Sequence, residues 1–354
     1  MKALFLAGGL GTRLRPLTDR LPKPMVPIMG RPLLERKFES LKLHGIDEIV
    51  LSTCYRPEAI ERYFGDGSAF GLKIRYVHED APLGTGGAIK NCEKYFDGTF
   101  FVFNADILSN INFSEMLRYH KRKQADVTIA ATRVGNPSAY GVIEFDENGY
   151  VSLFREKPAP REVVSHFINA GVYLFEPDVF RQIPSGRPVS VEREVFPKLL
   201  GLGKRVAVYR GCNYWLDIGT PAKYVQAHRD SFEGKLRLSE VDFRKRAVYG
   251  RLNAAISGTA TLRGPVYLGR NVRVGPGAVV GPRVVVGDDS VIGRKCMVAD
   301  SILWNDVVLE DKAELSECIV TDGKTVEEKS RLKHAICTPE TAKTTGNPSI
   351  RKTG

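Results

Sequence analysis

The chain has 354 residues, of which 43% are hydrophobic and 26% are charged. This length allows two domains with a core each, and the composition excludes a disordered or fibrous protein. The net charge of +11 suits polyanionic ligands, nucleoside triphosphates and nucleic acid alike, and it does not choose between them.

Cysteine usage and hydropathy indicate the compartment. Six cysteines are scattered without a CxxC pair, which argues against a zinc site or a disulfide framework and favours a reducing environment. No run approaches 18 apolar residues, and the N-terminus leads directly into a strand pattern without the features of a signal peptide. We therefore expect a cytoplasmic protein that has no membrane partner.

The most informative stretch lies at the start of the chain. An apolar strand ends at Leu6-Ala7, and the glycine-rich loop Gly8-Gly9-Leu10-Gly11-Thr12 follows, with Arg13, Arg15 and Lys23 beyond it. Backbone N–H groups in such a loop can face an anion at close range, and the cations can reach phosphate oxygens. The stretch lacks the Gly-Lys-Ser/Thr of a P-loop and the third glycine of the dinucleotide fingerprint. It predicts a nucleotide-phosphate site of another kind, against the alternative of a turn with solvated arginines.

Strand and helix patterns alternate after this loop. We expect helices at 32–44, 58–64 and 113–123, and strands at 46–53, 72–77, 99–104 and 125–132. This order predicts an α/β fold with a Rossmann-like, mixed and mostly parallel sheet, whose ligands bind beyond the carboxyl ends of the strands. From Tyr140 the pattern changes to hairpins, 141–145 with 150–155, which predict a subdomain laid over the sheet.

Two acidic residues stand where a nucleotide site needs them. Glu79 precedes a second glycine-rich turn, Pro82–Gly87, and a carboxylate is a suitable acceptor for the N–H donors of guanine. Its alternative is an acidic surface residue at a helix entry. Asp106 follows the apolar run 99–104, so it is well placed to hold Mg²⁺ on a triphosphate, against the alternative of a turn or N-cap aspartate.

The motifs together resemble one family. GGLGTRLRPLT followed by PKP, then PLGTGG, EKP, NAGVY and WLDIGTP, is similar to the sugar-1-phosphate nucleotidylyltransferases, or nucleotide-sugar pyrophosphorylases. The chain is most similar to the mannose-1-phosphate guanylyltransferases that carry a C-terminal hexapeptide-repeat domain. The likeness covers nearly the whole chain and weakens after about Gly323.

The resemblance implies a role for each motif. The catalytic residues would be Arg13, Lys23, Asp106 and Asp217, with Mg²⁺ held by Asp106 and Asp217 as the cofactor. The nucleotide would contact Leu6, Ala7, Gly8, Gly9, Gly11, Thr12, Glu79, Pro82, Gly84 and Thr85. The sugar phosphate would contact Gly141, Glu156, Lys157 and Asn169.

A six-residue period occupies the C-terminal third. Aliphatic-glycine pairs recur at 268, 274, 280, 286 and 292, with small or β-branched residues four positions after each, and the period continues imperfectly from 298. Each hexad can form a short strand and a turn with its aliphatics stacked inward, which looks like a left-handed parallel β-helix. We favour a structural, oligomer-forming or regulatory role for it over an acyltransferase site, because no catalytic histidine is evident.

These patterns divide the chain. We expect a catalytic domain over 1–234 with a sugar-phosphate subdomain at about 140–215, a connector at 235–253, a β-helix over 254–336 and a mobile basic tail over 337–354. The expected partners are a nucleoside triphosphate, a sugar 1-phosphate and further copies of the chain, without nucleic acid.

The resemblance leaves three alternatives to GTP and mannose 1-phosphate. The chain is similar to uridylyl- and thymidylyltransferases that act on glucose 1-phosphate, and its PLGTGGAI run resembles guanylyltransferases acting on a heptose 1-phosphate. A non-catalytic, nucleotide-sensing regulatory subunit, like those of the eukaryotic translation-initiation exchange factor, shares the two-domain layout. Such subunits usually lose the Arg, Lys and Asp positions that this chain keeps.

Overall fold

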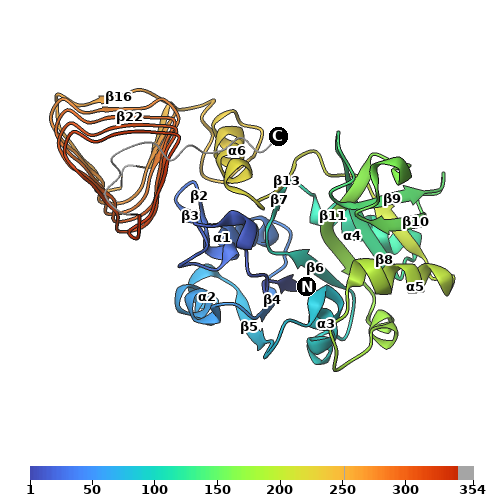
Figure 1. The fold of residues 1–354 in the computed structure, drawn as a ribbon. Coiled ribbons are helices and arrows are strands. Elements are labelled where there is room, and N and C mark those ends of the chain that lie inside the picture. The colour runs from blue at the N-terminus through green and yellow to red at the C-terminus, as the bar shows by residue number, and fades with distance from the viewer. Residues whose placement is uncertain (251, 342–354) are drawn as a thin grey trace. The chain divides into compact units, whose positions relative to one another are not determined.

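The computed structural model describes residues 1–250 and 252–341, which form two compact units that interleave along the sequence. The first unit contains Met1–Thr12, Leu21–Met25 and Lys37–Gly219. The second contains Arg13–Arg20, Val26–Arg36 and the chain from Thr220 onward. Neither unit is therefore a single stretch of sequence, although Figure 1 shows that each has its own architecture, a sheet with helices or a coil of short strands.

The first unit is built on a nine-stranded mixed sheet (Figure 1). Seven strands run in the order β10, β9, β11, β6, β1, β4, β5, and β8 pairs with β11 and β12. Strand β1 is parallel to β4 and β6, and β4 is parallel to β5, whereas β11 is antiparallel to β6, β8 and β9. The strand bounds are β1 Lys2–Leu6, β4 Glu48–Thr53, β5 Lys73–His78, β6 Phe100–Asn104, β8 Val127–Arg133, β9 Gly141–Phe145, β10 Val151–Glu156, β11 Phe167–Phe175 and β12 Val206–Tyr209.

The three helices predicted above, at 32–44, 58–64 and 113–123, begin within one residue of their expected starts. The helix bounds are α1 Leu33–Lys42, α2 Pro57–Phe64, α3 Gly84–Asn91, α4 Phe113–Lys123, α5 Phe196–Gly201 and α6 Pro221–Phe232. Local chemistry fixes two of the starts: the Asn112 side chain accepts a hydrogen bond from the N–H of Glu115, and Thr220 does the same for Lys223. Short helical turns lie at η1 Thr12–Leu14, η2 Lys23–Met25, η3 Ser68–Phe70, η4 Glu93–Tyr95, η5 Pro160–Glu162, η6 Pro177–Gln182 and the π-turn η7 Val191–Val195.

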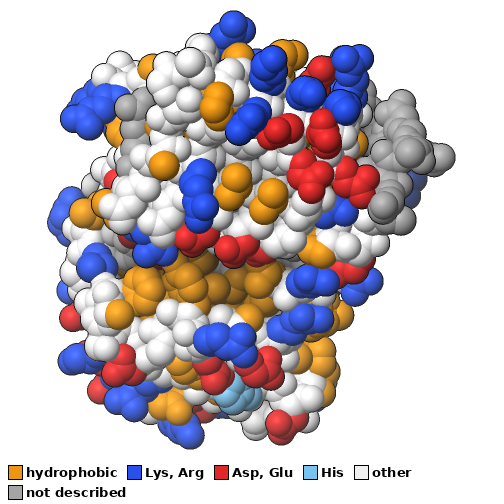
Figure 2. All heavy atoms as spheres, turned by 90° about the vertical axis from the view of Figure 1, so that its left-hand side faces the viewer, with side chains coloured by type: hydrophobic (Ala, Val, Ile, Leu, Met, Phe, Trp, Pro, Cys, Tyr) orange, Lys and Arg blue, Asp and Glu red, His pale blue; other side chains and the backbone are white. Residues whose placement is uncertain are grey.

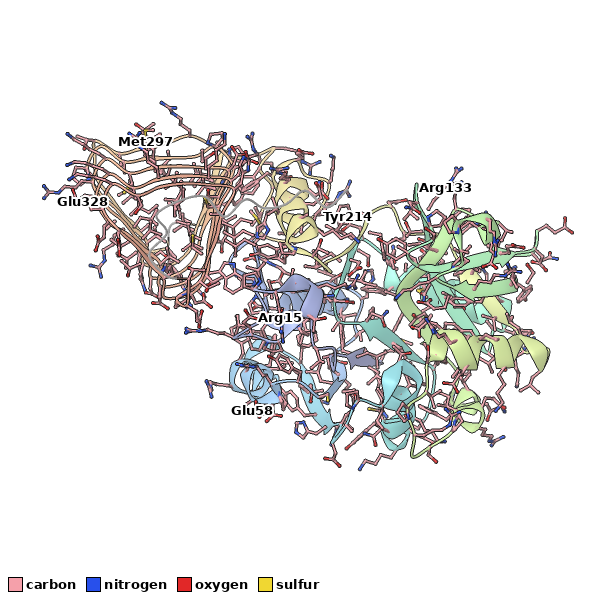
Figure 3. The ribbon with its side chains drawn as sticks, viewed as in Figure 1. Arg15, Glu58, Arg133, Tyr214, Met297 and Glu328 are labelled. Carbon is pink, nitrogen blue, oxygen red and sulfur yellow. The ribbon has the colours of Figure 1, made fainter. Side chains whose placement is uncertain are left out.

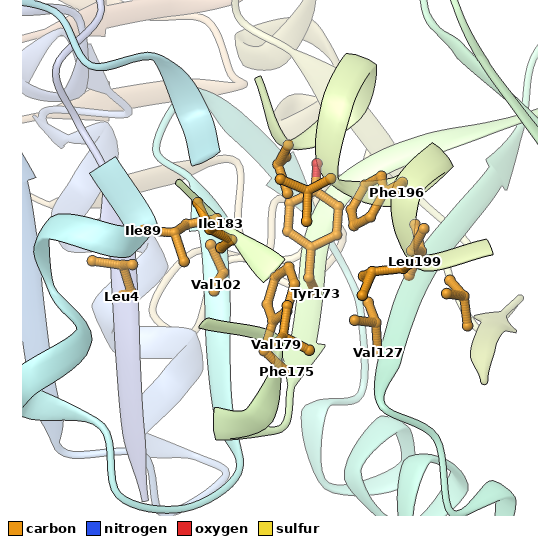
Figure 4. Close-up of a cluster of buried hydrophobic side chains, with 14 of the residues drawn as sticks. Leu4, Ile89, Val102, Val127, Tyr173, Phe175, Val179, Ile183, Phe196 and Leu199 are labelled. Carbon is orange, nitrogen blue, oxygen red and sulfur yellow. The ribbon is translucent and has the colours of Figure 1, made fainter. Parts of the chain in front are cut away.

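Aromatic and aliphatic side chains fill the space beside the sheet. Figure 4 shows Tyr173 and Phe175 of β11 packed with Phe196 and Leu199 of α5 and with Val127 of β8, and all five are buried. Burying each such side chain contributes about 1.5–3 kcal/mol. This core therefore holds the antiparallel and parallel parts of the sheet together as one body.

The hairpin of β9 and β10 differs from its predicted position. It extends the same sheet instead of lying over it, because Val142 of β9 pairs with Ile168 of β11. Strand β11 runs for nine residues, which is long enough to pair with β6, β8 and β9 at once. The length of this strand was not apparent from the sequence, and it explains the difference.

The second unit contains the predicted repeat as three parallel sheets that form a β-helix (Figure 1). The first sheet contains β14 Val248–Gly250, β17 Val266–Leu268, β20 Val284–Val286, β23 Ile302–Leu303, β26 Ile319–Val320 and β29 Ile336–Cys337. The second contains β15 Ala255–Ile256, β18 Arg273–Val274, β21 Val291–Ile292, β24 Val308–Leu309 and β27 Thr325–Val326. The third contains β16 Thr261–Leu262, β19 Val279–Val280, β22 Met297–Ala299, β25 Glu314–Ser316 and β28 Arg331–Lys333.

The register of the strands explains why the six-residue period becomes imperfect from 298. Val266 pairs with Val284, so the first coils contain three full hexads, but Val285 pairs with Ile302 and later coils are one residue shorter. The inward residues remain aliphatic and buried, among them Val280, Val298 and Leu315. Figure 3 shows Met297 and Glu328 on the outside of the coils. The coils continue to Cys337, inside the stretch predicted as a tail, and residues 342–354 of that tail lie outside the described residues.

A hairpin near the N-terminus belongs to this second unit. Strands β2 Pro27–Ile28 and β3 Arg31–Pro32 form it. The carbonyl of Pro27 accepts a hydrogen bond from the Tyr224 hydroxyl of α6 at 2.8 Å, and this hydroxyl accepts one from Trp304 Nε1 at 2.9 Å. The N–H of Met29 donates to Nε2 of the buried His228 at 3.2 Å. Helix α6 thus joins the hairpin to the β-helix.

Polar side chains stack along one corner of the β-helix. Asp288, Asn305 and Asp322 lie at equivalent corners of successive coils, and each accepts a backbone hydrogen bond through its side-chain oxygen, from Arg270, Asp288 and Asn305 respectively. Burial is the main cause that raises the pKa of Asp322 to about 6, and the charge of Asp306 adds to the effect. The folded state therefore binds a proton at Asp322 more tightly than the unfolded chain does.

This shift predicts a pH-dependent gain from Asp322→Asn. The stability that the raised pKa contributes is present below about pH 4 and is lost as the pH rises through 6, because the folded protein then holds a buried carboxylate. The amide avoids that cost and keeps the acceptor for Asn305. We expect the free energy of unfolding to rise by roughly 1–3 kcal/mol at pH 8 and to change little at pH 4.

Urea unfolding at both pH values measures the effect. Asp289→Asn, which changes an exposed aspartate of the same β-helix, is the matched control and should leave the free energy of unfolding nearly unchanged. An equal gain at pH 4 and pH 8 for Asp322→Asn would show that ionisation is not its cause.

Candidate active site

A cavity of about 320 Å³ lies in the first unit at the carboxyl ends of β1 and β6. Eight of the ten predicted nucleotide residues line it: Leu6, Ala7, Gly8, Gly9, Glu79, Pro82, Gly84 and Thr85. Lys23, Asn104 and Asp106 line it as well, and the predicted Gly11 and Thr12 are not among the described lining residues. The glycine-rich loop and turn, which are far apart in sequence, therefore meet at one cavity.

The second glycine-rich turn is held by the segment before η7. Gly84 has a φ of +68°, and a Cβ there would lie 2.6 Å from the carbonyl oxygen of Val189. The same carbonyl accepts hydrogen bonds from the N–H groups of Gly86 and Gly87 at 2.8 and 3.2 Å. Only glycine satisfies both the dihedral angle and the close approach, so this turn depends on its composition.

Backbone pairing brings the two predicted metal-binding aspartates together. Asp106 lies between β6 and β7 (Ile107–Ser109), and β7 pairs with β13 (Trp215–Asp217) so that Ile107 faces Asp217. The carbonyl of Asp106 also accepts a hydrogen bond from Ile218 N at 3.0 Å. Both carboxylates therefore come to the same place from distant parts of the chain, as predicted for Mg²⁺ ligands.

The Lys23 ammonium lies beside both carboxylates. Its Nζ is 2.5 Å from Asp106 Oδ2 and 3.7 Å from Asp217 Oδ1, and the lysine is only 8% exposed. Burial acts to raise the pKa of Asp106, but the charge and hydrogen bond of Lys23, with the charge of Lys37, hold it below its usual value. Asp106 is therefore a partly exposed carboxylate that lines the cavity as an anion.

Two aspartates fit the way in which Mg²⁺ is bound at phosphate-transfer sites. Among the described residues, no group of three or more His, Cys, Asp or Glu side chains could hold a metal by itself. Mg²⁺ usually takes one or two carboxylates together with substrate phosphates and water, so two carboxylates at a cavity of this kind suffice. Asp106 and Asp217 fit that donor set.

Glu79 holds the second glycine-rich turn, 82–87, in place. Its Oε1 accepts a hydrogen bond from the Ser52 hydroxyl at 2.8 Å, and its Oε2 accepts one from the N–H of Leu83 at 2.9 Å. Its carboxylate thus joins β4 to the turn at 82–87. Each carboxylate oxygen keeps a further lone pair, with which it could also accept a hydrogen bond from a base. The predicted contact of Glu79 with a base is therefore compatible with its structural role and stays a prediction.

Three of the four predicted sugar-phosphate residues form a second cluster in the same unit. Gly141 of β9 pairs with Glu156 of β10, and a Cβ on Gly141 would lie 2.8 Å from Glu156 Oε2. Lys157 follows directly, with Nζ 3.9 Å from Glu156 Oε1. Burial, and secondly the charge of Glu192, raises the pKa of Glu156. These three predicted residues are brought together.

The described side-chain hydrogen bonds of Asn169 lie within β11, and Arg13 lies in η1. The Asn169 side chain donates to the Tyr173 hydroxyl at 2.7 Å and accepts from Gly171 N at 2.9 Å, so it helps to shape β11. One amide N–H and one lone pair are left for a ligand. Arg13 is exposed in η1 and groups with the second unit. The roles predicted for both stay predictions.

Three polar residues that contact cavity residues were not predicted from the sequence. Ser52 orients Glu79, and Glu192 accepts hydrogen bonds from Thr85 Oγ1 at 2.7 Å and from Ser190 Oγ at 2.9 Å. Lys37 donates to the backbone near Asp106. Each contacts a partner far away in sequence, and none belongs to a motif that spacing could identify.

The surface charge bears on the predicted ligands. Figure 2 shows one face of the molecule, on which Lys and Arg side chains are interspersed with Asp and Glu instead of forming a continuous basic strip. Nucleic-acid proteins usually gather their cations along one face or groove. Within the described residues, no helix is both long enough and apolar enough to cross a membrane.

Comparison with known proteins identifies the family. The nucleotidyl transferase family profile matches residues 2–233, and that of the GMPPB C-terminal domain matches residues 262–352. A mannose-1-phosphate guanylyltransferase of Mycobacterium tuberculosis is 43% identical over 76% of this chain and 75% of its own length. A UTP–glucose-1-phosphate uridylyltransferase of Synechocystis is 36% identical over 77% of this chain and 75% of its own length.

A solved structure shows the same fold in the first part of the chain. HddC from Yersinia pseudotuberculosis, in complex with GMP-PN, superposes with a TM-score of 0.55 at 31% identity, over 64% of this chain and 97% of that chain. The nucleotidyl transferase profile covers well over half of the sequence. Residues of both glycine-rich motifs line the cavity at the strand ends of this chain. The chain therefore belongs to the nucleotidyl transferase family, as a sugar-1-phosphate nucleotidyltransferase similar to the mannose-1-phosphate guanylyltransferases.

Proposed function

We propose that the chain transfers GMP from GTP to mannose 1-phosphate, with GDP-mannose and pyrophosphate as products. The observation that carries the proposal is the cluster of the buried Lys23 with Asp106 and Asp217 at a cavity lined by two glycine-rich turns. The relatives support the choice of substrates. The mannose-1-phosphate guanylyltransferase of Mycobacterium tuberculosis covers 76% of this chain, and a probable one of Oryza sativa covers 95%. The GMPPB C-terminal profile matches residues 262–352.

In the proposed reaction, a sugar-phosphate oxygen attacks the α-phosphorus of GTP. A P–O bond forms, the bond from the α-phosphorus to the bridging oxygen breaks, and pyrophosphate leaves with the electron pair. The attacking phosphate is already ionised at pH 7, so positioning and charge neutralisation do most of the catalysis. No residue has to act as a strong general base.

The chain's own residues divide these tasks. The N–H groups of Gly8, Gly9 and Gly11 would cradle phosphate, and Lys23 would contact the α-phosphate from its buried position beside Asp106. Arg13 would neutralise the developing charge on the leaving pyrophosphate. A Mg²⁺ ion held by Asp106 and Asp217 would supply additional positive charge at the phosphates.

The sugar cluster would orient the second substrate. Lys157 would contact the phosphate of the incoming sugar, while Glu156, Gly141 and Asn169 would contact its hydroxyl groups. Partial burial and the charge of Glu192 raise the pKa of Glu156, and a carboxyl group can accept hydrogen bonds from sugar hydroxyl groups. The proposal therefore has separate binding sites for the two anions that must react.

A pyrophosphate-release screen tests the proposal directly. GTP, ATP, UTP and dTTP are each paired with mannose 1-phosphate, glucose 1-phosphate and a heptose 1-phosphate, and kcat/KM is measured. We expect the highest kcat/KM for GTP with mannose 1-phosphate. A higher value for UTP with glucose 1-phosphate would favour the activity named for the Synechocystis relative, and no release with any pair would favour a regulatory subunit.

Asp217→Asn tests the carboxylate pair. The amide cannot supply the second negative charge for a cation shared with Asp106, so we expect kcat to fall by about 10²-fold or more without unfolding. Asp178→Asn is the matched control, because Asp178 is exposed and pairs only with Arg181 among its described contacts. Near-normal turnover by folded Asp217→Asn would rule out the assignment.

Glu79→Gln tests the choice of base. If Glu79 accepts hydrogen bonds from guanine, one acceptor becomes a donor that faces a donor, and kcat/KM for GTP should fall about 10- to 100-fold. UTP and dTTP should lose less, because their carbonyl oxygens can accept from the amide. Measurement of kcat/KM for all three nucleotides decides the question.

Ser52→Ala provides the control for the structural role of Glu79. It removes the hydrogen bond to Oε1 and keeps the carboxylate, so the preference for GTP over UTP should persist while stability falls by about 1 kcal/mol. An equal loss for every nucleotide in Glu79→Gln would mean that Glu79 only supports the turn.

A further inference from the structure

A buried lysine closes the turn that carries Asp106. The Lys37 ammonium, on α1, donates hydrogen bonds to the backbone carbonyls of Asn104 and Ile107, each at 2.7 Å. These two residues flank Ala105 and Asp106, at the end of β6 and the start of β7. One side chain therefore holds both ends of the short connection on which Asp106 lies.

Lys37 is buried beside two aromatic rings, with the charges of Asp106 and Lys23 close enough to act on it. Lys37 is 9% exposed, and its Nζ lies 5.6 and 5.7 Å from the ring centroids of Phe5 and Phe103. Burial lowers its pKa to about 7, against the opposing effect of Asp106. A buried ammonium is costly unless it is well hydrogen-bonded, and an apolar side chain of similar size often gives equal or greater stability. Stability alone does not explain a lysine here.

Two other contacts hold the same connection from different sides. Ala105 N donates to Leu6 O at 3.2 Å, and Ile218 N donates to Asp106 O at 3.0 Å. These bonds join it to β1, where the glycine-rich loop begins, and to the strand that carries Asp217. Neither of these two bonds involves the carbonyls of Asn104 and Ile107, so Lys37 adds a separate constraint on the connection.

We propose that Lys37 is a positioning residue that fixes the 104–107 turn, and with it the direction of the Asp106 carboxylate, without touching either substrate. The proposal rests on the proposed function for its consequence in catalysis. The effect of Lys37 on the carboxylate pair does not depend on the proposed function, because a displaced Asp106 can no longer share a divalent cation with Asp217. Residues that orient metal ligands typically change metal affinity by about 10- to 100-fold when they are replaced.

Lys37→Met is the main test variant, because methionine is similar in length and lacks the N–H donors. Lys37→Gln keeps amide donors for the carbonyls and lacks the charge. Lys42→Met is the first control, since Lys42 lies on the same helix and donates to a single backbone carbonyl, that of Phe70, at 2.7 Å. Leu41→Ala is the second, because it removes a buried side chain of α1 and lowers stability without changing the turn.

The full-length protein is titrated with Mn²⁺ in the presence of a non-reactive GTP analogue, and free Mn²⁺ is measured by electron paramagnetic resonance. We expect the Mn²⁺ dissociation constant of Lys37→Met to rise about tenfold and that of Lys37→Gln to rise less. Both controls should bind Mn²⁺ as the wild type does. In turnover, kcat of Lys37→Met should fall about 10- to 100-fold, with KM for mannose 1-phosphate within about twofold.

Wild-type Mn²⁺ affinity in Lys37→Met, or a loss no greater than that of Leu41→Ala, would overturn the proposal. If Lys37→Met does not fold, Lys37→Gln is judged against Leu41→Ala by the same two criteria. A wild-type protein that releases no pyrophosphate while the Mn²⁺ differences hold would contradict the proposed function and leave the role of Lys37 supported.

Discussion

The candidate active site depends on one electrostatic constraint: carboxylates that lie close together repel each other unless a cation balances their charge. In this protein the cation is the buried ammonium of Lys23, which contacts Asp106 and lies near Asp217. Backbone pairing of β7 with β13 brings the two aspartates together. The positive charge of Lys23 offsets the repulsion between their carboxylates. The pairing and the charge balance therefore support each other.

Glu79 similarly combines a structural and a proposed binding role at the second glycine-rich turn, 82–87. Glu79 is tied to Ser52 and Leu83, so its carboxylate fixes the backbone of the turn that it would also use to contact a base. Thr85 links this turn to Glu192, which lies near Glu156 in the sugar cluster. A hydrogen bond thus links the second glycine-rich turn to Glu192, whose charge in turn raises the pKa of Glu156.

Contiguous motifs predict the local backbone of the candidate site. Glycine spacing predicts the turns from which Gly8, Gly9, Gly84 and Thr85 line the cavity, although Gly11 and Thr12 are not among its described lining residues, and the six-residue repeat predicts the β-helix. Lys37 and Glu192 were missed because their partners are backbone carbonyls or hydroxyl groups distant in sequence. The hairpin at 141–156 was misplaced because the length of β11 decides its position.

The hairpin of β2 and β3 has a consequence for how the chain folds as it is made. Met29 N and His228 Nε2 are hydrogen-bonded across 199 positions of sequence. At a synthesis rate of about 5–20 residues per second, the hairpin would wait roughly 10–40 s for α6 to appear. Its exposed strands would be free to pair with other chains in that interval. The short length of β2 and β3, two residues each with a proline in both, limits that risk.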